Sequence, residues 1–231
     1  MENQNHQGHE SGTHHKADAG NFFKDLPPIP KIDFKSVNLK NLQNGLGDIF
    51  EMVKMNKAKM HEVAGREHEG VGVALVYLLV AQLVASLGGV VFGYQIPLIG
   101  SFHTSLGQAL LNFVLQAVCS VVGLYFVQFV AQKFGGKGSF TGYFRVMGYL
   151  SVLSIFGFLT FLPIIGMLAG LWMLVLSFVA LKEIHQLSNE KTVFTFVIAF
   201  VVIFVISAIL SSFGMGFGGM NYTGSRGFTL N

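Results

Sequence analysis

The stretch VGVALVYLLVAQLVASLGGVVF, residues 71–92, decides the fold of this 231-residue chain. It contains no charged residue and no histidine, and it is about as long as the 20 or so apolar residues that a helix needs to cross the hydrocarbon core of a bilayer. Its continuous apolar run lacks the alternation of barrel strands, and an open sheet cannot exist in lipid. We therefore expect a transmembrane helix at about Val71–Phe92.

Four further apolar stretches follow, at about Leu106–Val130, Phe144–Leu162, Ile164–Leu181 and Val193–Phe213. Only Pro163 and its neighbours separate the third and fourth of the five, and one helix across both would be far too long for one crossing. Because proline disfavours helix in the residue before it, a tight hairpin that breaks at Thr160–Pro163 is the natural solution. A re-entrant pair that never fully crosses is the alternative. The predicted fold is all-α, a polytopic membrane helix bundle with five transmembrane helices over residues 71–213.

The charged residues lie mostly outside these stretches. Only 12% of the chain is charged, against about 25% in soluble domains, and residues 1–70 hold most of that charge. Residues 1–36 are rich in His, Gly and Pro and are expected to be a disordered tail without a signal peptide. Residues 214–231 are rich in glycine and are expected to be flexible.

Residues 37–70 have a different pattern. Apolar side chains recur every three or four residues with charged residues between them, at Leu39, Leu42, Leu46, Ile49 and Val53. This spacing predicts an amphipathic juxtamembrane helix on the cytoplasmic side. Such a helix either lies in the headgroup plane or packs on the cytoplasmic ends of the spans.

Basic residues in the loops predict the orientation, because cytoplasmic loops carry an excess of Lys and Arg. The excess alternates at every crossing, with Lys or Arg before the first span and after the second and fourth, at Lys54, Lys57, Lys59, Arg66, Lys133, Lys137, Lys182 and Lys191. Loop 93–105 has none, and the C-terminal tail has only Arg226. The N-terminus is therefore expected in the cytoplasm and the C-terminus outside or in the lumen.

The apolar cores offer little chemistry. They contain no Asp, Glu, Lys or His, although membrane enzymes and ion-coupled transporters usually need ionisable groups at membrane depth. The histidines of the tail have no preorganised geometry, the single Cys119 cannot form a disulfide within the chain, and the basic residues are not clustered. We expect no enzyme, no catalytic residue, no cofactor, no metal site and no nucleic-acid partner.

The polar side chains within the cores are Gln82, Asn112, Gln116 and Gln128, besides several hydroxyls. Asn112 and Gln116 share a helix face, where they either form hydrogen bonds between helices or line a polar groove for a lipid or small solute. Arg145 is expected to reach the cytoplasmic surface and pair with lipid headgroups. Gly89 with Gly93, and Gly166 with Gly170, have the spacing of a close helix contact. Residues 182–191 are expected to be a solvated loop.

The segment from Gly138 to Phe200 resembles the Yip1 domain family. The resemblance depends on Phe144-Arg145 ahead of Gly148-Tyr149, Pro163 and Gly166 at a turn, Leu171-Trp172, and Ala180-Leu181-Lys182-Glu183-Ile184-His185. It implies a five-span protein which in eukaryotes acts in ER or Golgi vesicle trafficking with Rab-type GTPases. The chain lacks the Asp-Leu-Tyr-Gly-Pro motif of eukaryotic members, and Val152–Leu153 stand where a proline is expected. These departures favour a prokaryotic-type member in the cell membrane.

The leading hypothesis is a non-enzymatic integral membrane protein that organises membrane or partner proteins. Its expected partners are the lipid bilayer and either other membrane proteins or further copies of itself. The residues predicted to contact lipid or partners are Arg145, Asn112, Gln116, Gly148, Tyr149 and Pro163. The alternative is a transporter or permease subunit for a small or hydrophobic solute.

Overall fold

The computed structural model describes residues 32–66, 71–96, 100–159 and 162–212. The C-terminal tail that the sequence predicts to be flexible, residues 214–231, and the N-terminal tail up to residue 31 lie outside the described residues. The elements are, in chain order, η2 Phe34–Ser36, α2 Leu39–Val53, α3 Lys57–Gly65, α4 Gly72–Val91, β1 Tyr94–Ile96, β2 Gly100–Phe102, α5 Leu106–Lys133, α6 Phe140–Leu150, η3 Ser151–Phe158, α7 Pro163–His185 and α8 Asn189–Ser212.

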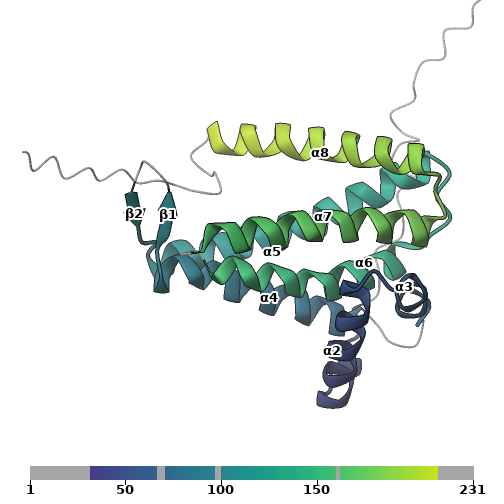
Figure 1. The fold of residues 1–231 in the computed structure, drawn as a ribbon, viewed down its shortest axis with the longest axis horizontal. Helices are drawn as coiled ribbons and strands as arrows, with labels where there is room; N and C mark the ends of the chain where they lie inside the picture. The colour runs from purple at the N-terminus through teal and green to yellow at the C-terminus, as the bar shows by residue number, and fades with distance from the viewer. Residues whose placement is uncertain (1–31, 67–70, 97–99, 160–161, 213–231) are drawn as a thin grey trace, which may run out of the picture.

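Four long helices form the body of the molecule and run along its length (Figure 1). In the described part of the chain, α4, α5, α7 and α8 are long and apolar enough to cross a membrane. They begin and end close to the first, second, fourth and fifth predicted spans. Most of the large side chains on α8 are exposed and apolar, as expected for a surface in contact with lipid.

The third predicted span, Phe144–Leu162, has a different local structure. It begins earlier, as the short α-helix α6, and continues without a break as the 3-10 helix η3. At the junction the Ser151 hydroxyl donates to the Gly148 carbonyl at 2.5 Å, a local side-chain bond that competes with the α-helical ladder. The next helix, α7, begins at Pro163, and η3 packs against it. Residues 160–161 of the predicted hairpin lie outside the described residues.

Close backbone contact joins α4 to α6 and η3. A Cβ on Gly148 would lie 2.7 Å from the Ala74 carbonyl oxygen, and a Cβ on Gly88 would lie 2.5 Å from that of Phe158. Glycine at both positions therefore allows α4 to approach the α6–η3 segment closely at two points, Gly148 in α6 and Phe158 in η3. The predicted pair Gly166 and Gly170 makes no such contact, since a Cβ on Gly170 would meet no atom within 4 Å.

The amphipathic segment is divided into two helices, not one. The break lies at residues 54–56, where Met55 has a φ of 63°, and the Asn56 side chain accepts from the Lys59 amide to begin α3. Figure 1 shows α2 crosswise to the long helices at one end of the bundle, with α3 beyond it. We call α2 and α3 together the cap, and this end of the bundle the cap end.

At the opposite end, the described part of the chain departs from an all-helical fold. The antiparallel strands β1 and β2 form a short hairpin between α4 and α5, with Gln95 opposite Ser101. The hairpin falls in loop 93–105, which has no lysine or arginine. The two ends of the bundle therefore differ in both structure and charge.

Replacing Gly148 with alanine should destabilise the protein, because the added Cβ forces two backbones apart. We expect a loss on the order of 1–3 kcal/mol, typical of overpacking, measured as a lower midpoint of thermal unfolding in detergent. Gly170→Ala is the matched control and should not lower the midpoint. Equal midpoints for the two variants would contradict the close contact between α4 and α6.

Candidate functional site

The guanidinium of Arg145 lies at the junction between the cap and the bundle. The side chain is only 1% exposed. It therefore does not reach the cytoplasmic surface, which differs from the prediction from the sequence. Its Nη1 donates to the carbonyl oxygens of Val63 at 3.1 Å and Ala64 at 2.9 Å. These carbonyls belong to the last turn of α3, where a helix leaves backbone acceptors unsatisfied. Arg145 therefore caps α3 and draws it onto α6.

A small residue allows this approach. A Cβ on Gly142 would lie 2.9 Å from the Ala64 carbonyl oxygen, so α6 presents bare backbone to the end of α3. A cation near a helix C-terminus also interacts favourably with the helix dipole. The contact between α3 and α6 therefore depends on close backbone packing at Gly142 and on the charge of Arg145.

Asp48 joins the two helices of the cap. It is 6% exposed, and its carboxylate accepts from Arg66 at 2.6 and 3.1 Å and lies 3.3 Å from Lys59 Nζ. Planar two-point pairing between a guanidinium and a carboxylate is among the stronger polar contacts in proteins. Asp48 therefore fixes α2 against α3.

Glu62 extends the same network at the surface. It accepts from Lys59 and from Arg66, each at 2.6 Å. These hydrogen bonds, first from Lys59 and then from Arg66, hold the pKa of the Glu62 carboxyl below its ordinary value. The bond to Glu62 is also the main reason that the pKa of Lys59 is raised. Both shifts favour the charged forms that make up the network.

Two aromatic side chains of the long helices hold α2. The Tyr77 hydroxyl of α4 donates to the Leu42 carbonyl, and the Trp172 indole of α7 donates to the Val53 carbonyl at 3.1 Å. Tyr77 also lies under Gly45, where a Cβ would come within 2.8 Å of its ring. These contacts hold α2 near its first turn and at its C-terminal end.

The cap also contacts the end of α7. Lys57 Nζ lies 2.7 Å from Glu183. Residues 182–185 complete α7 and are not the solvated loop predicted from the sequence. His185 is fully buried, with its ring edge-on to Tyr143 at 5.4 Å between centroids.

The predicted contact residues fall in separate places. Gly148 and Tyr149 lie inside the bundle, where Tyr149 packs edge-on against Tyr77 at 5.2 Å between centroids. Asn112 and Gln116 are half-buried on α5, whereas Pro163 begins α7. The structure therefore brings Gly148, Tyr149 and Arg145 together on α6 but does not join them to the α5 pair.

Two of the four polar side chains in the predicted cores are engaged within the protein. Gln82 donates to the Ser120 hydroxyl at 2.6 Å and joins α4 to α5. Gln128 donates to the Gly138 carbonyl at 2.9 Å and holds the loop between α5 and α6. Gln82 therefore forms a hydrogen bond between helices, the first of the two alternatives for such groups, whereas Gln128 bonds to a loop.

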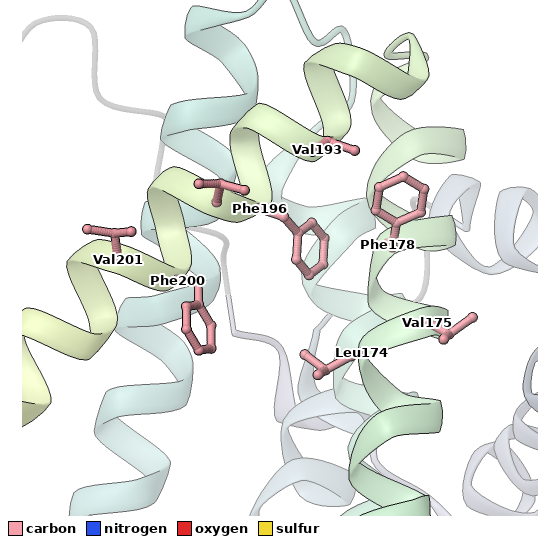
Figure 2. Close-up of a pocket in the computed structure, with 8 residues that line it drawn as sticks. Leu174, Val175, Phe178, Val193, Phe196, Phe200 and Val201 are labelled. Carbon is pink, nitrogen blue, oxygen red and sulfur yellow. The ribbon is translucent and has the colours of Figure 1, made fainter.

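A groove with a volume of about 500 Å³ lies between α7 and α8. It is lined only by apolar side chains, several of which point into it in Figure 2: Leu174, Val175, Phe178, Val193, Phe196, Val197, Phe200 and Val201. It opens because α8 packs mainly on α5 and less on α7. Its lining offers no group that could hold a polar solute.

Comparison with known protein families gives a match to the Yip1 domain. The profile of the Yip1 domain matches residues 51–211, more than half of the chain. This protein belongs to the Yip1 domain family. No curated protein and no solved structure matches it. Family and structure agree on an integral, multi-pass membrane protein, and the matched region includes α3 and Arg145.

The sequence prediction for this Yip1 domain protein missed Asp48 and Glu183. The apolar spacing did not indicate Asp48, because it lies opposite Leu39 around the axis of α2 and is buried with Gly45, Ile49 and Met52 only in the folded structure. Glu62 and Arg66 have the four-residue spacing of an ion pair within a helix. Nothing local indicated Glu183, whose partner lies on the distant α3.

Replacing Asp48 with alanine should loosen the cap of this Yip1 domain protein. The change leaves Arg66 and Lys59 without their shared, mostly buried partner, and such losses are much larger than those at exposed pairs. We expect faster hydrogen–deuterium exchange in residues 39–65 and unchanged exchange in α4 and α5. Lys54→Ala, which removes an exposed pair with Glu51, is the control and should leave exchange in α3 unchanged. Identical exchange in the two variants would argue against the Asp48 joint.

Proposed function

We propose that this Yip1 domain protein is a non-enzymatic membrane protein that organises the bilayer or its partner proteins through the cap. The observation that carries the proposal is the way the cap is held. Arg145, Asp48, Tyr77 and Trp172 fix two short helices crosswise on one end of an apolar bundle. A rigid surface at the membrane edge suits a scaffold.

The bundle has five spans in this proposal. The α6 helix of 11 residues and the η3 helix of 8 residues have a combined length of about 30 Å, which equals the thickness of a hydrocarbon core. Their close contact with α4 supports a full crossing.

The cap end faces the cytoplasm in this proposal. It holds the start of α4, the end of α5, the end of α7 and the start of α8 (Figure 1). The basic residues that predicted the orientation belong to these ends, which supports an N-terminus in the cytoplasm and a C-terminus outside.

The alternative function, a transporter, has weaker support. Of the four polar side chains that suggested it, Gln82 and Gln128 are engaged in hydrogen bonds within the protein. The groove between α7 and α8 is wholly apolar. Only Asn112 and Gln116 stay as candidates for a polar path, so we do not propose transport.

Cysteine accessibility tests the orientation. In a Cys119→Ser background, Lys137→Cys at the cap end should react with a membrane-impermeant maleimide only after cells are opened. His103→Cys, near the hairpin, should react in intact cells. The reverse pattern, or labelling of both in intact cells, would overturn the orientation.

Reconstitution tests the function. Full-length protein in liposomes should change vesicle shape, seen by cryo-electron microscopy, and deletion of residues 37–64 should weaken this effect. Deletion of residues 1–31, which spares the cap, is the control. Unchanged vesicle shape on deleting the cap would count against the proposal, as would solute flux that Asn112→Leu/Gln116→Leu abolishes.

A further inference from the structure

One flank of α2 is apolar and exposed. Leu39, Leu46 and Phe50 are 72%, 48% and 69% exposed, although each is a large hydrophobic side chain. They are seven and four residues apart and therefore share one face of the helix. The side of α2 that packs on the bundle is a different one, which holds Gly45, Ile49 and Met52.

The direction of this flank follows from Asp48. Each residue turns an α-helix by about 100°, so Leu39 lies opposite Asp48 around the α2 axis, and Leu46 and Phe50 lie close to that position. Asp48 pairs with Arg66 and Lys59 of the α3 region, which lies beyond α2 at the end of the molecule (Figure 1). The apolar flank therefore faces away from α3 and toward the level of the spans.

The depth of α2 follows from Tyr77, which lies in the second turn of α4, near the cap end. Tyrosine and tryptophan are enriched at the boundary between headgroups and acyl chains, because they pair an apolar ring with a polar tip. Tyr77 and Trp172 both donate to backbone carbonyls of α2. Trp172 is itself 39% exposed near the middle of α7, so the C-terminal end of α2 lies beside an exposed part of the bundle.

The other flank of α2 is polar. Lys40, Asn44 and Glu51 lie about 120° around the axis from the apolar flank, and Glu51 pairs with Lys54 at 2.9 Å. The helix thus has three sides, of which one contacts protein, one is charged and one is apolar. This is the arrangement of a helix lying at a membrane surface beside its own spans.

We propose that Leu39, Leu46 and Phe50 insert into the boundary between headgroups and acyl chains of the leaflet at the cap end. The inference deepens the proposed function and depends on it for the role of the cap, since it names the lipid surface as what α2 contacts. The flank occupies one leaflet only, and its position beside the spans is set by the bundle.

Site-directed fluorescence quenching tests the depth of α2. Phe50→Cys and Asn44→Cys, each in a full-length Cys119→Ser background, carry a bimane label in phosphatidylcholine–phosphatidylglycerol vesicles. Lipid spin-labelled near the headgroup should quench the label at residue 50 several-fold more than that at residue 44. Aqueous iodide should show the opposite preference. Both positions are exposed, so labelling should leave the fold intact, which elution in detergent checks.

Two results would overturn the inference. One is equal access of iodide to both labels. The other is a label at residue 50 that is shielded from iodide but not quenched by lipid, with shielding that falls as the protein is diluted in lipid. That result would mean that a second copy of the protein, and not lipid, covers the flank. The quenching experiment reports only the depth of α2 in the bilayer. Failure of this inference is therefore distinguishable from failure of the proposed function, which the vesicle-shape test measures.

Discussion

The hydrogen bonds from Arg145 to the end of α3 join the two parts of this protein. A guanidinium at 1% exposure needs partners, because an unpaired charge in an apolar interior is very costly. The carbonyls of Val63 and Ala64 need donors for the same reason. Each side satisfies the other, and α3 is thereby held against α6. The contacts of α3 with Asp48 and Glu183 depend on that position.

Polar contacts are concentrated at the cap end, whereas close backbone packing dominates along the bundle. At the cap end, ion pairs, a capped helix terminus and aromatic donors hold short helices crosswise. Along the bundle, contact relies on bare backbone at Gly88 and Gly148 and on hydrogen bonds such as that from Gln82 to Ser120. This division follows from the bilayer, where hydrocarbon cannot drive apolar helices together and small residues permit close packing. A Yip1 domain protein built in this way has its distinctive surface at the membrane edge.

Two predictions from the sequence differ from the structure for identifiable reasons. Glycine spacing suggested a contact at Gly166 and Gly170, but Gly148 and Gly88 make the close contacts, because spacing does not reveal which face meets a neighbour. The spacing of residues 37–70 predicted a single helix, but the chain forms α2 and α3, with Asp48 buried and Leu39, Leu46 and Phe50 exposed. The pattern found the helix but did not reveal which side packs on protein.

The sequence by itself determined where the long apolar helices lie. The length of an apolar run measured against the thickness of a bilayer is a local property, so α4, α5, α7 and α8 could be located closely. Only the tertiary structure decided the partners of Arg145 and Asp48. Arg145 bonds to Val63, 82 residues away along the chain, and Asp48 bonds to Arg66, 18 residues away. Such pairings depend on how the helices pack across one another, and hydrophobicity along the chain does not indicate which helices come into contact. The joint between cap and bundle is therefore a property of the fold.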